Sequence, residues 1–191
     1  MGSQDYSSVP AGLPRPVDEG ACGHLQNCKV PCIDLTATDG TSVRLATQQG
    51  VTVVFCYPMT GRPGVSLPDG WDDIPGARGC TPQACSYKDK HTDIAKLGAR
   101  LYGLSSQTTA YQSEAAQRLH LPYPLLSDHE LKLTSALKLP TFSVDVKEKL
   151  IKRLTLIVKD GVIVKCLYPI FPSDSDVHDV LRWLQDLEQA R

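Results

Sequence analysis

The chain has 191 residues, 41% hydrophobic and 21% charged, a globular balance that excludes collagen-like, coiled-coil and wholly disordered proteins. Its length suits a single domain. The formal net charge is −1, so a nucleic-acid partner, which would call for a basic excess, is not indicated. No apolar run approaches the roughly 20 residues of a membrane span, so no membrane partner is expected.

Residues 1–20 combine three prolines with glycine and serine and are predicted to form a flexible N-terminal tail. They lack the basic and apolar regions of a secretory signal. The domain is then expected over residues 21–191. Seven cysteines, an odd number, are too few for a disulfide scaffold and favour reduced, metal-bound or catalytic thiols. We therefore expect a cytoplasmic protein, with the nucleus and mitochondria left open.

Two elements and a long loop are predicted in the first part of the domain. Cys32–Leu45 alternates around Asp39-Gly40, a strong signal for an N-terminal β-hairpin. Val51–Tyr57 is apolar on both faces, which indicates a central, buried strand. Residues 59–79 are rich in glycine and proline and predict an inserted loop, of a length that is usually functional or disordered.

A helix is predicted next, over Thr81–Leu97, with Thr81 as N-cap, Pro82 in the first helical position and Gly98 at the end. The remaining elements are a strand over Ala99–Ser105, a helix over Thr109–His120, a strand end at Leu125-Leu126, a helix from Asp128 through Leu137, strands Leu150–Val158 and Val162–Tyr168 joined at Asp160-Gly161, and a closing helix with a stripe of Val177, Val180, Leu181, Leu184 and Leu187. This order predicts one α/β domain with a central mixed sheet and helices on both faces, compatible with a thioredoxin-like fold.

The cysteine pair Cys80 and Cys85 is the most informative feature of the sequence. Cys80 falls at the start of the helix predicted after the buried strand and the loop. Backbone N–H groups and the helix dipole at that position favour a thiolate, which is the reactive form of cysteine. Burial of both cysteines as inert core residues is the alternative, and the position of Cys80 at a helix start counts against it.

The spacing of the pair restricts how the two sulfurs can meet. Five residues of regular helix place the two Cα atoms about 8.7 Å apart, beyond the roughly 7 Å that a disulfide allows. A disulfide between Cys80 and Cys85 therefore requires the first helical turns to unwind. This predicts a cycle of Cys80 oxidation to sulfenic acid, local melting, and condensation with Cys85.

The segments Phe55–Pro58 and Gly79–Cys85 resemble those of the peroxiredoxins, and are closest to the peroxiredoxin Q group, also called bacterioferritin comigratory protein. The resemblance extends from about Val30 to the C-terminus. It implies a thioredoxin fold and a thiol-dependent peroxidase that reduces hydrogen peroxide and organic hydroperoxides. By this resemblance Cys80 is the peroxidatic cysteine and Cys85 the resolving one. A thioredoxin-type reductant and a monomeric state are also implied.

Two further residues are carried over from the resemblance. Arg153 matches an arginine that the family places beside the peroxidatic sulfur, where a guanidinium stabilises negative charge; Lys152 would point to the other strand face. The family also places a hydroxyl three residues before the peroxidatic cysteine, where this chain has Ala77. We expect Thr60 to fold back and supply that hydroxyl, with Ser66 as the second candidate.

The sequence signals for a metal site, a cofactor site or another redox function are weaker than those for a peroxidase. Cys22, Cys28 and Cys32 cluster with His24, but their spacing is not that of a usual zinc knuckle, so no metal is expected. One of these three cysteines could instead resolve Cys80. No glycine-rich phosphate loop is present, and we expect no cofactor.

A non-enzymatic redox sensor and a thiol–disulfide oxidoreductase on the same fold remain alternatives, the latter disfavoured because there is no C-x-x-C motif. Trp71 in the loop is either a lid over the site or a loop anchor.

Overall fold

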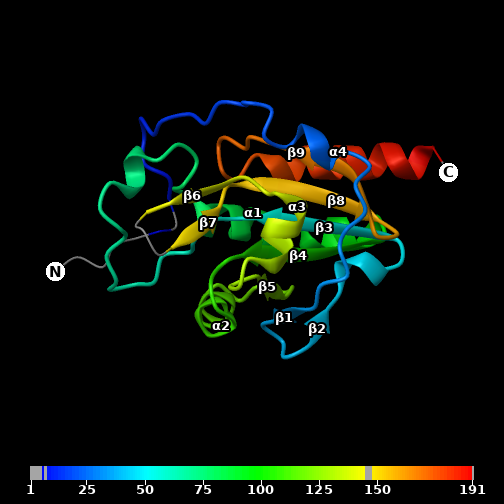
Figure 1. The fold of residues 1–191 in the computed structure, drawn as a ribbon, viewed down its shortest axis with the longest axis horizontal. Helices are drawn as coiled ribbons and strands as arrows, with labels where there is room; N and C mark the ends of the chain where they lie inside the picture. Colours follow the sequence, from blue (N-terminus) through cyan, green and yellow to red (C-terminus); the bar gives the residue numbers. More distant parts are fainter. Residues whose placement is uncertain (1–5, 7, 145–147, 191) are drawn as a thin grey trace.

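A seven-stranded mixed sheet forms the centre of the computed structural model, which describes residue 6, residues 8–144 and residues 148–190 (Figure 1). The strands lie in the order β2-β1-β5-β4-β3-β8-β9, with β3 parallel to β4 and antiparallel to β8. The strands are β1 (Leu35–Ala37), β2 (Ser42–Val43), β3 (Val51–Cys56), β4 (Ala99–Ser105), β5 (Leu125–Ser127), β6 (Thr141–Ser143), β7 (Lys149–Ile151), β8 (Leu154–Lys159) and β9 (Val162–Leu167). The helices are α1 (Cys80–Lys96), α2 (Thr109–Arg118), α3 (Lys132–Leu137) and α4 (Asp176–Gln189), with 3-10 turns at Gly23–Leu25, Leu45–Thr47 and Trp71–Asp73.

The central strand β3 separates two hydrophobic cores. Its six residues are all buried, and they alternate between the two faces of the sheet. Val53 and Phe55 pack with α1 and α4 in one core, whereas Val54 and Cys56 pack with α3 and the N-terminal segment in the other. The predicted α/β architecture with helices on both faces is therefore confirmed.

Most of the predicted elements are present. The hairpin around Asp39-Gly40 is the antiparallel pair β1–β2, and the second hairpin turns at Asp160-Gly161 between β8 and β9. Gly98 follows α1 with a φ of 73°, a left-handed conformation that suits glycine at a helix end. In α4 the side chains of Val177, Val180 and Leu184 are buried, as the stripe predicts.

Helix α1 begins one residue before the predicted range, and its N-cap lies two residues before the predicted one. Gly79, rather than Thr81, is the N-cap, and the Thr81 hydroxyl is buried with no hydrogen-bond partner among the described residues. Gly79 has a φ of 103°, and a Cβ at this position would lie 2.1 Å from the Ser173 Oγ. A glycine is therefore required here, and it brings Cys80 into the first helical position.

The strand predicted over Leu150–Val158 is wrong as a single element. It is two strands, β7 and β8, and β7 leaves the main sheet to pair with β6, which was not predicted. Leu150 of β7 forms a third core with Trp71 and Ala77, so the inserted loop 59–79 packs on the β6–β7 pair. The break between β7 and β8 occurs at Lys152-Arg153.

The helix predicted from Asp128 begins later, at Lys132. The Asp128 carboxylate still accepts hydrogen bonds from the backbone N–H groups of Leu133 (3.1 Å) and Thr134 (2.7 Å). Asp128 therefore stabilises the helix start from outside the helix, four residues before Lys132, because the intervening turn brings the carboxylate back to it.

The predicted tail over residues 1–20 lies partly outside the described residues. Within the described part, Arg15 stacks on Phe171 at 5.2 Å and Tyr6 donates a hydrogen bond to the Val65 carbonyl at 2.6 Å. This segment thus crosses the inserted loop. Among the described residues, no helix is both long and apolar enough to cross a membrane.

Candidate active site

Cys80 opens α1 directly after the inserted loop, at the carboxyl end of β3, and its side chain is only 4% exposed. Its thiol donates to the Ala77 carbonyl at 3.6 Å. The first N–H groups of a helix lack intrahelical partners and favour negative charge in front of them. Cys80 therefore lies at the positive end of the α1 dipole.

Arg153 contacts this sulfur. Its side chain is 3% exposed, and its Nη2 donates to the Cys80 Sγ at 3.2 Å. The same nitrogen donates to the carbonyls of Ala77 (3.2 Å) and Arg78 (3.1 Å), which fix the guanidinium at the end of the loop. The break between β7 and β8 releases Arg153 from strand pairing and lets it reach α1. Lys152 is half-buried and points into a neighbouring cavity instead.

A buried polar chain, which was not predicted from the sequence, continues from Arg153 to the last helix. Arg153 Nη1 donates to Gln83 Oε1, and Gln83 Nε2 donates to Asp176 Oδ2 at 3.3 Å. The same oxygen accepts from the hydroxyls of Tyr87 and Thr155, each at 2.7 Å. Burial raises the pKa of the Asp176 carboxyl, and the hydrogen bonds from Thr155, Tyr87 and Gln83 oppose that rise. Gln83 was detectable in principle, because it lies one helical turn after Cys80; Asp176, 96 positions away from Cys80, was not.

Cys85 lies in the same unbroken helix as Cys80 and is half-buried. Burial raises the pKa of the Cys85 thiol, and the nearby Lys88 ammonium opposes this rise. The continuous helix keeps the two sulfurs on different turns. The structure therefore describes the reduced pair before any unwinding, with all seven cysteines free.

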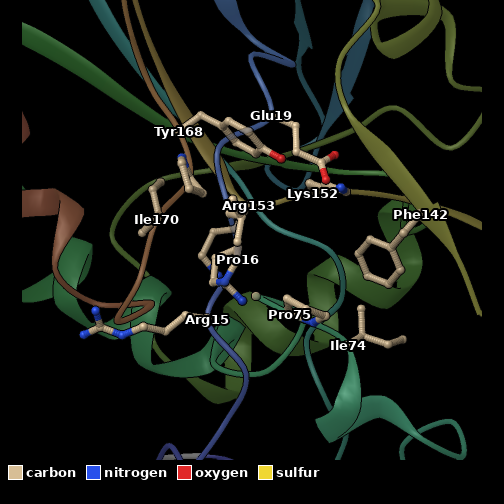
Figure 2. Close-up of a pocket in the computed structure, with 13 residues that line it drawn as sticks. Arg15, Pro16, Glu19, Ile74, Pro75, Phe142, Lys152, Arg153, Tyr168 and Ile170 are labelled. Atoms are coloured by element: carbon tan, nitrogen blue, oxygen red, sulfur yellow. The ribbon is translucent and has the colours of Figure 1, made fainter.

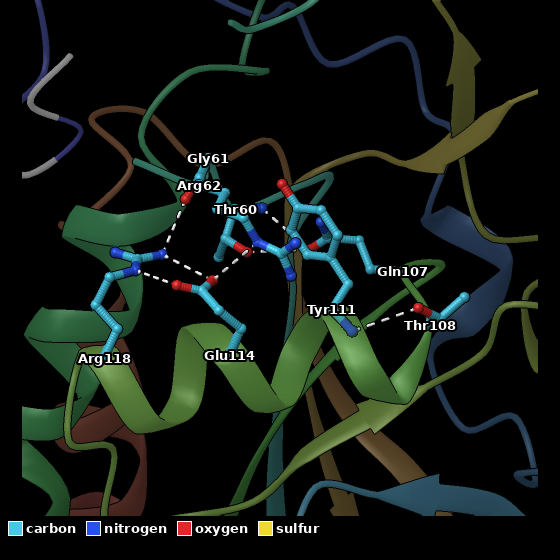
Figure 3. A network of polar contacts seen from close by, with 8 residues as sticks. All are labelled: Thr60, Gly61, Arg62, Gln107, Thr108, Tyr111, Glu114 and Arg118. Atoms are coloured by element: carbon cyan, nitrogen blue, oxygen red, sulfur yellow. Dashed lines mark hydrogen bonds and ion pairs between the residues drawn. The ribbon is translucent and has the colours of Figure 1, made fainter. Parts of the chain in front are cut away.

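Thr60 is buried beside α2 (Figure 3). Its hydroxyl and its backbone N–H both donate to Gln107 Oε1, at 3.2 and 3.1 Å. Its neighbours Met59 and Gly61 line a small cavity that also includes Cys80. Ser66, the second candidate for the hydroxyl, is exposed at the outer part of the loop.

Helix α2 anchors the first residues of the inserted loop (Figure 3). Arg118 donates to the Gly61 carbonyl at 2.9 Å and is paired with Glu114 at 2.7 Å. Glu114 is also paired with Arg62 at 3.6 Å, and the Arg62 guanidinium stacks on the Tyr111 ring at 4.5 Å. These contacts hold the chain around Thr60 close to the start of α1.

The cavity beside the Cys80 sulfur is about 10 Å³, the space of about one water molecule. Tyr6 and Trp71 line it, and Trp71 is 3% exposed. Trp71 also packs in the core formed with Leu150. Its side chain thus both anchors the loop and closes one wall of the cavity.

A larger cavity of about 320 Å³ lies on the other side of Arg153 (Figure 2). Arg15 and Glu19 of the N-terminal segment line it together with Lys152 and Arg153. Its apolar wall consists of Ile74, Phe142 and Ile170, with Pro16, Pro75 and Pro169 beside them. Cys80 does not line this cavity but lines the smaller one.

The N-terminal cysteines lie away from this site. Cys22 and Cys28 pack in the core on the opposite face of the sheet from Cys80, and Cys32 is exposed. Cys56 and Cys166 belong to that opposite core as well. His24 contacts the Leu137 carbonyl at 2.8 Å. Within the part of the chain that the structure describes, no group of three or more His, Cys, Asp or Glu side chains is placed to hold a metal ion.

A thioredoxin-like sheet with a cysteine at a helix start, contacted by a buried arginine, defines a cysteine-based redox protein. Residues 25–182 match the family model described as Redoxin. The chain therefore belongs to the redoxin family, and within it to the peroxiredoxin Q/Bcp-like group.

The relatives are similar over most of the chain. Chloroplastic peroxiredoxin Q from Suaeda salsa is 29% identical over 82% of this chain and 66% of its own length. Peroxiredoxin Bcp from Bacillus subtilis is 27% identical over 84% of this chain and 95% of its own. Among solved structures, peroxidoxin BcpB from Mycobacterium tuberculosis superposes with a TM-score of 0.65, at 23% identity, over 84% of this chain and 96% of that chain. That likeness confirms the fold.

Proposed function

We propose that this chain is a thiol-dependent peroxidase with Cys80 as the peroxidatic residue. The observation that carries the proposal is the 3.2 Å contact between the Cys80 sulfur and the Arg153 guanidinium at the start of α1. The Cys80 thiolate attacks the terminal oxygen of a hydroperoxide, and the O–O bond breaks. Sulfur becomes a sulfenic acid, and the other oxygen leaves as water or alcohol after taking a proton. Arg153 stabilises the negative charge on that departing oxygen.

Resolution follows within the same chain. The first turns of α1 unwind, the Cys85 sulfur attacks the Cys80 sulfenic acid, and a disulfide forms with release of water. A thioredoxin-type dithiol then reduces this disulfide, becoming oxidised itself and returning two thiols. The cycle thus needs no cofactor of its own.

Stopped-flow fluorescence tests the proposal directly. Reduced protein is mixed with hydrogen peroxide, Trp71 and Trp183 report the reaction, and mass spectrometry identifies the product. A fast reaction that ends in a Cys80–Cys85 disulfide supports the peroxidase. Fast oxidation without recycling by thioredoxin would instead identify a redox sensor.

Hydrogen peroxide and organic hydroperoxides are the proposed substrates. A bacterioferritin comigratory protein from Xanthomonas campestris, 17% identical with a TM-score of 0.63, is described for its alkyl peroxide reduction activity. Because the cavity at Cys80 is about 10 Å³, a bulky hydroperoxide must displace Tyr6 or the loop to enter. Hydrogen peroxide is therefore proposed as the faster substrate.

We also propose a monomer in the cytoplasm, with residues 21–191 as its one domain. An intramolecular resolving cysteine needs no second subunit. Seven cysteines that are all free are compatible with a reducing compartment. Gel filtration tests the monomeric state, and localisation of a tagged chain tests the compartment.

Cys85→Ser is expected to allow one oxidation by peroxide and then to stop the cycle with thioredoxin. The reason is that no other thiol lies on the first turns of α1 to condense with the sulfenic acid. Trapping with dimedone followed by mass spectrometry measures the stalled intermediate. Cys166→Ser, on the opposite sheet face, is the matched control and should cycle normally. Continued cycling of Cys85→Ser would move the resolving role to Cys22, Cys28 or Cys32.

Thr60→Val is expected to slow Cys80 oxidation by about fivefold, the usual effect of losing one hydrogen bond between neutral groups. The reason is that the Thr60 hydroxyl is proposed to turn from Gln107 towards the bound peroxide. There it would replace the hydroxyl that is missing at Ala77. Thr60→Ser keeps the hydroxyl and should oxidise at close to the wild-type rate. Equal rates for the valine variant and the wild type would limit Thr60 to anchoring the loop.

A further inference from the structure

Asp176 is the buried end of the polar chain that begins at the Cys80 sulfur. Its side chain is 2% exposed, and its Oδ2 accepts three hydrogen bonds, two of them from residues of α1. Those two residues, Gln83 and Tyr87, lie one turn apart on the helix that carries both cysteines. Asp176 therefore ties the start of the last helix to the segment of α1 that separates Cys80 from Cys85.

The two residues held by Asp176 differ in how firmly the rest of the protein holds them. Tyr87 is fully buried and stacked on Phe55, with ring centroids 4.5 Å apart and planes within 8°. Gln83 lies between the two cysteines, inside the part of α1 that must unwind before they can meet. Tyr87 thus belongs to the part of α1 that remains folded. The Gln83–Asp176 hydrogen bond has to break when the first turns of the helix unwind.

We propose that Asp176 is a positioning residue that holds α1 in its folded, peroxide-reactive form and sets how readily the helix start unwinds. It acts through Gln83 in two ways. Gln83 accepts a hydrogen bond from Arg153, so a Gln83 side chain fixed by Asp176 keeps the guanidinium in contact with the Cys80 sulfur. The hydrogen bond from Gln83 to Asp176 also opposes the unwinding that brings Cys85 to Cys80. This inference rests on the proposed peroxidase cycle.

Asp176→Asn is expected to change the two steps in opposite directions. The amide carries no negative charge, so its hold on Gln83 weakens. Loss of a hydrogen bond to a charged group is worth about tenfold in an equilibrium. Disulfide formation should therefore speed up by up to about tenfold, and Cys80 oxidation should slow by roughly three- to tenfold. Stopped-flow fluorescence resolves the two phases, and the fraction of sulfinic acid at high peroxide should fall because the sulfenic acid is consumed sooner.

Two control variants separate this role from a loss of charge or stability. Asp179→Asn removes an exposed carboxylate from the same first turn of α4 and should leave both rates unchanged. Val180→Ala lowers the melting temperature by opening the core under α4, without touching the polar chain, and should leave the ratio of the two rates unchanged. If Asp176→Asn lowers both rates together, or changes neither, the inference is wrong.

Gln83→Glu provides a second test that does not depend on the folding of the Asp176 variant. Beside the Arg153 guanidinium, the new carboxylate still accepts from the arginine but cannot donate to Asp176. Resolution should speed up while oxidation changes less than in Asp176→Asn. An unchanged resolution rate would overturn the inference. A wild-type protein that forms neither sulfenic acid nor the Cys80–Cys85 disulfide would overturn the proposed function, and this inference with it.

Discussion

Cys80→Ser is expected to abolish peroxide turnover, reducing it to the uncatalysed rate. A serine hydroxyl does not ionise near neutral pH, and it cannot be oxidised by a peroxide as a thiolate is. The fold should tolerate the change, because the hydroxyl can still donate to the Ala77 carbonyl that accepts from the thiol. Peroxide consumption coupled to thioredoxin oxidation measures the loss.

The matched control for Cys80→Ser is Cys56→Ser, at the end of strand β3. Cys56 is fully buried on the opposite sheet face, and burial raises the pKa of its thiol above the ordinary value, so it stays protonated. Peroxide turnover should survive in that variant, although its stability falls because a hydroxyl enters the core. Turnover that persists in Cys80→Ser would remove Cys80 from the peroxidatic role.

The sequence predicted the elements in which local and tertiary preferences agree. Val51–Tyr57 is apolar on both faces and forms the central strand, and Asp39-Gly40 forms the first hairpin turn. It did not predict that Leu150 would leave the main sheet. Leu150 packs instead with Trp71 and Ala77 of the inserted loop, in a separate core. Such a contact joins residues far apart in the chain and leaves no periodic signal.

The candidate site was predicted only in part, because some of its residues carry a local signal and others meet only through contacts between distant parts of the chain. Cys80 and Cys85 carry a local signal in their spacing at a helix start, and Arg153 came from the resemblance; the structure places Arg153 on the Cys80 sulfur. Gln83 was missed although it lies one helical turn after Cys80, and Asp176 was missed because a buried aspartate far along the chain has no sequence pattern of its own. Both became visible only in the packed structure, where Asp176 Oδ2 accepts two hydrogen bonds from α1 and one from β8.

Arg153→Met is expected to slow the oxidation of Cys80 by about 10²-fold, the cost that is typical for removing a donor to developing negative charge. Methionine keeps much of the buried volume and removes every donor. The Cys80 sulfur then loses its 3.2 Å contact, and the departing oxygen loses its positive partner. Arg153→Lys keeps the charge but not the planar fork that contacts Gln83 and Cys80 together, so an intermediate rate is expected. Stopped-flow oxidation by hydrogen peroxide measures these rates.

Alkylation by iodoacetamide separates the two proposed effects of Arg153, which are stabilisation of the Cys80 thiolate and stabilisation of the departing oxygen. Both reagents need the thiolate, but only the peroxide develops charge on a departing oxygen that lies against the guanidinium. The loss in peroxide rate should therefore exceed the loss in alkylation rate. Lys152→Met is the matched control, because this neighbouring cation lines the cavity of about 320 Å³, which Cys80 does not line, and both of its rates should match the wild type. Equal losses in the two reactions of Arg153→Met would restrict Arg153 to holding the thiolate, with no part in breaking the O–O bond.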